Sequence, residues 1–72
     1  MTPQRFRETL DALHMRQIDA ARLLGVGVRT VKTWSQIDGD GPTEPAARFL
    51  RFITATGADP ETVETILSLE DH

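Results

Sequence analysis

The chain has 72 residues, a formal net charge of −3 and no cysteine, and its composition is 39% hydrophobic and 26% charged. This balance predicts one globular domain, and it excludes a disordered chain, a disulfide-stapled fold and a cysteine-ligated zinc site. The amino-terminal residues lack the apolar stretch of a signal peptide, and no apolar run approaches the roughly 20 residues of a membrane span. We therefore expect a soluble, cytoplasmic domain whose small core is stabilised by helix packing, oligomerisation or both.

The charge is distributed unevenly along the chain. Residues 1–36 contain six basic and three acidic side chains, whereas residues 37–72 contain two basic and eight acidic ones. Electrostatic interactions are screened over about 8 Å at physiological salt, so the two halves can present different potentials to a partner. A negative net charge of the whole chain is therefore compatible with a locally basic surface that binds a polyanion.

Helical signals recur along the chain, and no segment alternates apolar and polar residues as a strand does. Thr2 followed by Pro3 predicts an N-cap and a first helical residue, and the apolar spacing then predicts a helix over residues 3–13. A second helix is predicted over residues 17–24, where Gly25 ends it in a left-handed conformation. The inward side chains expected from these helices are Phe6, Leu10 and Leu13, then Ile18, Ala21 and either Leu24 or Leu23.

Three further helices complete the pattern. One is predicted over residues 28–36 and is followed by a loop rich in glycine and aspartate. The next begins at Thr43 or Glu44, and the last covers residues 59–69, where an aspartate cap precedes a proline. Five short helices without a strand predict an all-α fold with a single domain over residues 1–72.

Residues 17–36 have the spacing of two helices that cross through a three-residue turn. Such a pair needs a small residue at the crossing, a glycine in the turn and bulky side chains where the second helix packs on the first. The chain supplies them with Ala21, Gly25, Val31 and Trp34. A packed pair without a ligand would need the same four residues, so they predict architecture and not function.

One face of the third predicted helix points to function. At about 100° per residue, this face collects Val28, Arg29, Lys32, Thr33 and Gln36. In a DNA major groove, arginine and lysine can bond guanine, glutamine can bond adenine, and valine and threonine methyl groups can contact thymine. We therefore predict that these five residues contact bases of double-stranded DNA. The alternative is a solvated polar face.

The segment QIDAARLLGVGVRTVKTW resembles the helix-turn-helix of the Cro/repressor-like family, often called the XRE family, and the similarity covers roughly residues 3–55. The resemblance implies a compact five-helix, λ-repressor-like domain in which the second helix crosses the DNA backbone and the third lies in the major groove. It also implies a transcriptional regulator, most often a repressor. The subgroup with a proline-led fourth helix includes antitoxins and regulators associated with anti-CRISPR operons.

The resemblance also assigns contacts to the DNA backbone. Gln17 matches a glutamine that commonly contacts phosphate, and Arg22 is either a phosphate contact or a plain surface residue. The family usually has serine where this chain has Arg16, and serine or threonine in place of Gly27, so Gly27 has only its backbone N–H to offer a phosphate. The loop after Trp34 also departs from the family pattern, which often has Glu-Ser-Gly there, and Asp38 and Asp40 would repel phosphate if this loop approached the DNA backbone.

A single recognition helix spans only a few base pairs. We therefore expect a homodimer on an inverted repeat, with half-sites about 10 base pairs apart or a multiple of that distance. The last predicted helix has an apolar stripe beyond the needs of a four-helix core, and the predicted dimer contacts are Val63, Ile66, Leu67 and Phe52. The alternative is that this helix only caps the core.

Other kinds of site have weaker support in the sequence. The glycines at 25 and 27 follow a helix and lack the other elements of a nucleotide-binding loop, and the acidic turn lacks the final glutamate of a calcium loop. His14 and His72 have no partner at a metal-binding spacing, so we predict no metal, no cofactor and no enzymatic activity. Two other functions stay open: an antitoxin or other module that binds a partner protein through its acidic second half, and a DNA adaptor of phage packaging or recombination.

Overall fold

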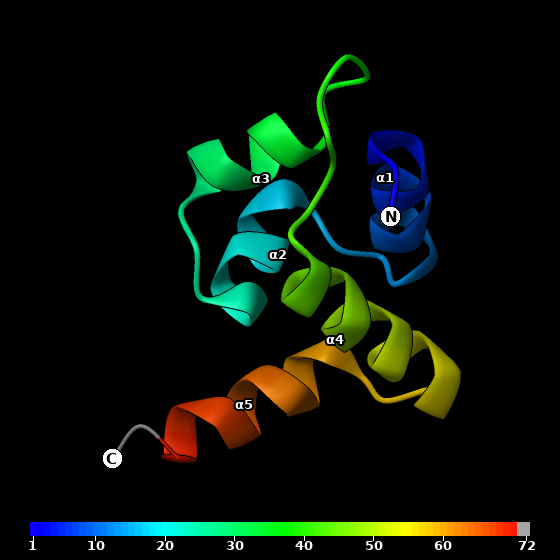
Figure 1. The fold of residues 1–72 in the computed structure, drawn as a ribbon. Helices are drawn as coiled ribbons and strands as arrows, with labels where there is room; N and C mark the ends of the chain where they lie inside the picture. Colours follow the sequence, from blue (N-terminus) through cyan, green and yellow to red (C-terminus); the bar gives the residue numbers. More distant parts are fainter. Residues whose placement is uncertain (71–72) are drawn as a thin grey trace.

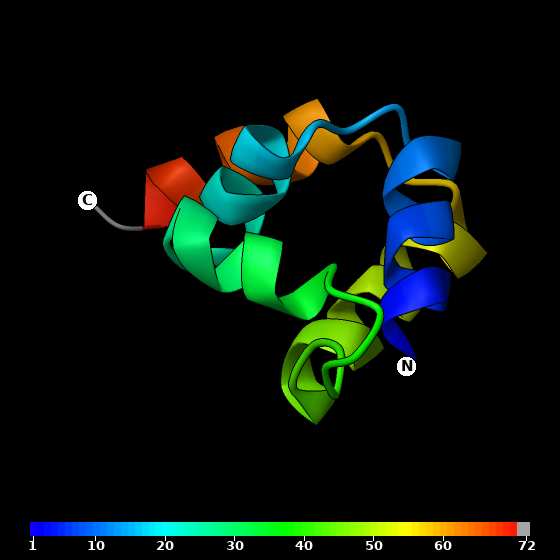
Figure 2. The same cartoon turned by 90° about the horizontal axis from the view of Figure 1, so that it is seen from above.

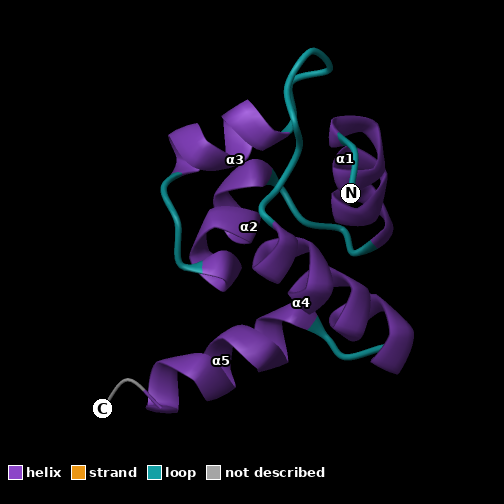
Figure 3. Ribbon diagram, viewed as in Figure 1, coloured by secondary structure: helices purple, strands orange, loops and turns teal. Residues whose placement is uncertain are grey.

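The computed structural model describes residues 1–70, and this part of the chain is all-helical, as predicted (Figures 1 and 3). The helices are α1 (Pro3–Ala12), α2 (Gln17–Leu24), α3 (Val28–Trp34), α4 (Glu44–Thr56) and α5 (Pro60–Glu70). Within the described range, none of them has the length and apolar character needed to cross a bilayer.

The helix boundaries follow from local caps. The Thr2 hydroxyl accepts a hydrogen bond from the backbone N–H of Arg5 at 3.1 Å, and the Asp59 carboxylate accepts one from the N–H of Thr62 at 3.2 Å. These contacts begin α1 and α5 by satisfying amides that have no partner inside the helix. At the other end of α2, Gly25 has a φ of 70°, the left-handed conformation predicted for it.

Helix α3 is shorter than the sequence predicts, because it ends at Trp34 and not at residue 36. The N–H of Ser35 is shared between the carbonyls of Val31 and Lys32, and the N–H of Gln36 bonds the carbonyl of Thr33 at 3.2 Å. This tightening to three-residue spacing closes the helix, and the chain turns away. The prediction that this helix extends to Gln36 is therefore wrong, and the predicted contact of Gln36 with bases stays a prediction.

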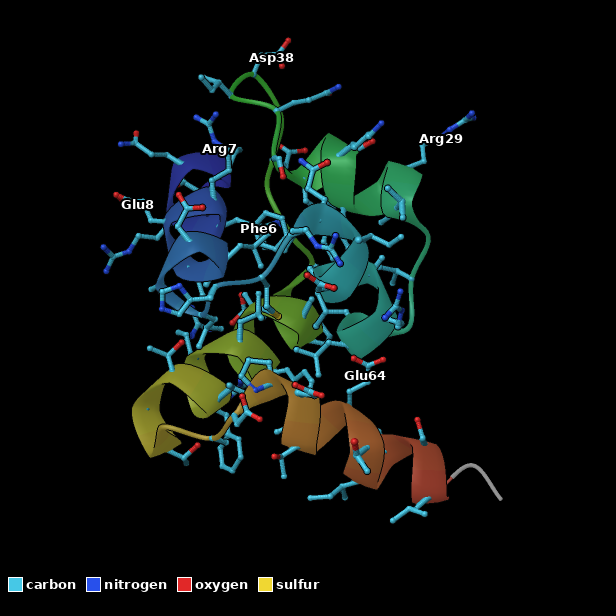
Figure 4. The ribbon with its side chains drawn as sticks, turned by 180° about the vertical axis from the view of Figure 1, so that it is seen from behind. Phe6, Arg7, Glu8, Arg29, Asp38 and Glu64 are labelled. Carbon is cyan, nitrogen blue, oxygen red and sulfur yellow. The ribbon has the colours of Figure 1, made fainter. Side chains whose placement is uncertain are left out.

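The core lies between the first four helices. Its buried apolar residues are Phe6, Leu10, Met15, Ala20, Ala21, Leu23, Val31, Trp34, Ala47, Leu50 and Ile53. The rings of Phe6 and Trp34 meet edge to face, with centroids 5.9 Å apart, and Phe6 points into the interior in Figure 4. In α2, Leu23 is buried and Leu24 is half-buried against the core. Ile18 is exposed, contrary to prediction, because it lies about 160° around the helix from the buried Ala20.

The arrangement of the helices separates two sides of the domain. Helices α2 and α3 make the most extensive contact, while α1 packs on α4 and α5 packs on α2. Seen from above, α1 lies on one side of the domain and the α2–α3 pair on the other (Figure 2). The α2–α3 pair therefore has a face that no other helix of the described chain covers.

Candidate nucleic-acid interface

A three-residue turn sets α3 across α2. Gly25 ends α2 with a left-handed φ of 70°, and the N–H of Val26 bonds the carbonyl of Ala21 at 3.1 Å. Gly27 then has an extended conformation and precedes the first residue of α3. Because Ala21 is small and buried at the crossing, the two helices can approach closely, as the sequence predicts.

Helix α3 has one buried and one exposed side. Val31 and Trp34 are buried against the rest of the domain. We call the opposite side the outer face of α3, and its residues are Val28, Arg29, Lys32 and Thr33. All four are exposed, and Arg29 projects away from the body of the protein in Figure 4. The structure thus brings together four of the five residues predicted to contact bases.

Among the side chains that the structure describes, those of residues 1–69, the two cations of the outer face form no ion pair. The salt bridges in this range are Arg16–Asp19 at 3.1 Å and Arg51–Glu44 at 2.8 Å. Arg29 and Lys32 are thus free to meet a polyanion without first breaking an intramolecular ion pair.

The hydroxyl of Thr33 is occupied by the helix itself. It donates a hydrogen bond to the carbonyl of Arg29 at 3.0 Å. A threonine hydroxyl has a single hydrogen, so this bond leaves an acceptor and a methyl group for anything that approaches the outer face. Thr33 therefore presents a methyl group and a hydrogen-bond acceptor on the outer face, and its hydroxyl hydrogen is not available.

Gln17 lies beside the end of α3 and is half-buried. Its side-chain amide donates to the hydroxyl of Ser35 at 3.4 Å, and that hydroxyl donates to the carbonyl of Val31 at 3.0 Å. The chain of bonds links the start of α2 to the end of α3 and leaves Gln17 a second N–H for a phosphate. Sequence reasoning missed Ser35, because the predicted helix included it as an ordinary residue and its partner Gln17 lies 18 positions earlier. The hydroxyl bond to the fourth preceding residue is the signal that could have identified it.

The two other residues predicted to contact the DNA backbone, Gly27 and Arg22, lie on different sides of the domain relative to the outer face of α3. Gly27 lies at the start of α3, next to the outer face, as predicted. Arg22 lies about 140° around α2 from Gln17 and lines a groove of about 550 Å³ between α2 and α5. Apart from Arg22, the charged side chains of this groove are the four acids Asp19, Asp59, Glu61 and Glu64. Arg22 is thus placed with the acidic groove and not with the outer face of α3.

A residue that the sequence analysis did not identify organises the start of α2. The carboxylate of Asp19 accepts hydrogen bonds from the backbone N–H of Arg16 at 2.9 Å and from its guanidinium at 3.1 Å. These bonds with Arg16 lower the pKa of the Asp19 carboxyl below its ordinary value. The carboxylate satisfies the N–H of the cap residue Arg16 itself, the contact that the third residue of a capping box makes. An acidic residue three positions after the cap is the sequence signal for it.

The residues predicted to form the dimer interface differ in how exposed they are. Phe52, Ile66 and Leu67 have exposed fractions of 64%, 53% and 40%, and Leu69 is also exposed. Val63 is half-buried and packs against the core of its own chain, and its predicted dimer contact stays a prediction. The docking of α5 on α2 turns Val63 inward and leaves Ile66 and Leu69 outside.

No protein-family profile, curated protein or solved structure matches this chain. In the described part of the chain, no three histidine or carboxylate side chains come together as metal ligands. His72 lies outside the described residues. The geometry of the chain itself is therefore the basis for assigning a function.

Proposed function

We propose that this protein binds double-stranded DNA in a sequence-specific manner and regulates transcription, most simply as a repressor. In this proposal, α2 and α3 form the helix-turn-helix of a λ-repressor-like domain, and α3 enters the major groove. The observation that carries it is the outer face of α3, where Arg29 and Lys32 are exposed and form no ion pair with the described side chains of residues 1–69.

The electrostatics of the domain favour this orientation. The residues up to 36 have a surplus of basic side chains, and the residues after 36 have a surplus of acidic ones. The outer face of α3 contains only basic charges, whereas the groove between α2 and α5 is mainly acidic. A duplex that approaches α3 is attracted, and one that approaches the groove is repelled.

The proposal includes a homodimer in the cytoplasm that acts on an inverted repeat, without enzymatic activity or a cofactor. One α3 reads too few base pairs for useful specificity, and two copies double the number of bases that are read. The exposed apolar residues of α5, with Phe52, are the surface proposed for the dimer.

The proposal is tested by selection from random duplex DNA, followed by titration of the selected site with the Arg29→Ala variant. Loss of a bidentate contact to guanine is expected to weaken binding by about 1–3 kcal/mol and to relax the base preference at one position. Arg7→Ala is the matched control, because it removes the same charge from α1, on the far side of the domain from Arg29 (Figure 4). Equal effects of the two variants would contradict the placement of α3 in the groove.

A second candidate function is supported by the acidic groove. A groove lined by Asp59, Glu61 and Glu64 beside apolar Leu13 and Leu23 suits a basic, partly apolar segment of a partner protein, as in an antitoxin. Glu64 points toward this boundary of α2 and α5 in Figure 4. Co-expression with the product of a neighbouring gene tests it, and the expected complex is lost in a Glu61→Lys, Glu64→Lys variant that still binds DNA.

A further inference from the structure

The outer face of α3 presents a restricted set of chemical groups. The cations Arg29 and Lys32 lie in its middle. Val28 and Thr33 lie at its two edges, each about 40° around the helix from the nearer cation. Val28 is exposed at the first helical position, so its methyl groups are accessible. Two cations are therefore flanked by two methyl-bearing side chains.

No neutral side chain of this face has a free hydrogen-bond donor. The single hydroxyl hydrogen of Thr33 is directed to the carbonyl of Arg29 at 3.0 Å. Gln36, which the sequence places on this face, lies beyond the end of α3. Thr30 is half-buried and lies outside the arc from Val28 to Thr33.

We infer that α3 reads guanine through its hydrogen-bond acceptors and thymine through its 5-methyl group, and that it does not read adenine with a bidentate bond. This inference rests on the proposed DNA-binding function. Guanine offers two acceptors to a cation in the major groove, thymine is the base with a methyl group there, and bidentate contact with adenine requires a carboxamide. The preferred half-site therefore contains guanine accompanied by thymine.

The inference is tested on the DNA by replacing each thymine of the selected site with deoxyuridine, one position at a time. This change removes a methyl group and leaves every hydrogen-bonding atom in place. At the positions that face Val28 and Thr33, we expect about a fourfold loss of affinity, the equivalent of one methyl group no longer buried.

The matching test on the protein separates the methyl group of Thr33 from its hydroxyl. Thr33→Val keeps a methyl group at the same place and is expected to keep most of the affinity, because the hydroxyl that it removes is already bonded to the carbonyl of Arg29. Thr33→Ser keeps the hydroxyl and removes the methyl group, so its affinity for the selected site is expected to fall about fourfold. Replacing the facing thymine with deoxyuridine is then expected to cause no further loss of affinity. Val28→Ala gives the same test at the other edge. Thr56→Ser is the matched control, since this exposed threonine of α4 also donates to the carbonyl four residues earlier.

The possible outcomes are distinct. If selection enriches no duplex sequence, the proposed function fails and the inference falls with it. If a site is enriched but deoxyuridine has no effect at any thymine, the inference alone is overturned. It is also overturned if Thr33→Val loses affinity while Thr33→Ser keeps it, because the hydroxyl would then be the group that reads the base.

Discussion

Gly27 differs in backbone conformation from Gly25, the other glycine of the turn. Its φ of −75° and ψ of 155° are open to any amino acid, and a Cβ atom added to it would meet nothing within 4 Å. Gly25, two residues earlier, has a left-handed φ of 70° that favours glycine. Gly25 is thus required by the turn, whereas Gly27 leaves α3 without a side-chain cap.

Gly27→Ser is expected to stabilise the domain by about 0.5–1 kcal/mol. A serine hydroxyl can cap the first amides of α3, and the loss of glycine reduces the freedom of the unfolded chain. Urea unfolding measures the change, and Gly27→Ala is the control, because alanine restricts the unfolded chain without providing a cap. If serine stabilises no more than alanine, the start of α3 does not need a cap.

At the scale of a single helix, the start of α2 depends on an ionised group. The pKa of the Asp19 carboxyl is lowered by its hydrogen bonds with Arg16. Because the pKa is lowered in the folded state, the ionised carboxylate stabilises the fold at pH values above its ordinary pKa of 3.8. That contribution is lost as the pH falls through the lowered pKa.

Asp19→Asn is therefore expected to make the stability of the domain less dependent on pH below about 4. Because Asp19 lies at the surface, the loss at neutral pH is expected to be small. Urea unfolding of both proteins between neutral and acidic pH provides the comparison. Asp11→Asn, at an exposed position of α1, is the control. If the free energy of unfolding changes with pH in the same way for Asp19→Asn and the wild type, the bonds with Arg16 do not stabilise α2.

Local signals explain which features of the helices the sequence could predict. Caps and glycine stops act within a few residues, so the starts of α1 and α5 and the end of α2 follow from the sequence. The end of α3 does not, because Ser35 and Gln36 are compatible with a helix and only the shared N–H of Ser35 ends it. The Gln17–Ser35 bond joins residues 18 positions apart, a contact that no local pattern reveals.

The same distinction applies to the candidate site. The outer face of α3 was predictable, since helical periodicity alone groups its four residues. The position of Arg22 was not, because it depends on how α5 packs against α2. The inward turn of Val63 has the same cause.

At the scale of the whole molecule, the domain has three distinct surfaces. The outer face of α3 is basic, the groove between α2 and α5 is mainly acidic, and the free side of α5 is apolar at Ile66 and Leu69. Figure 1 shows that α5 leads away from the other helices toward its end, so its free side can meet a second copy.

Ile66→Asp is expected to convert a dimer to a monomer, because it places a charge in an apolar interface. Light scattering measures the mass. Ser68→Asp is the matched control, since it adds the same charge about 160° around α5, on the side of the acidic groove. A mass that is unchanged by Ile66→Asp, or changed equally by both variants, would exclude this side of α5 from the interface.

The salt dependence of binding to the selected duplex tests the central claim most directly. A protein that neutralises phosphates releases counterions, so the logarithm of the association constant falls linearly with the logarithm of salt concentration, by about 0.9 per phosphate contact. We expect a steep negative slope for the wild type. A flat response would contradict DNA binding through the outer face of α3 and would favour a protein partner at the acidic groove.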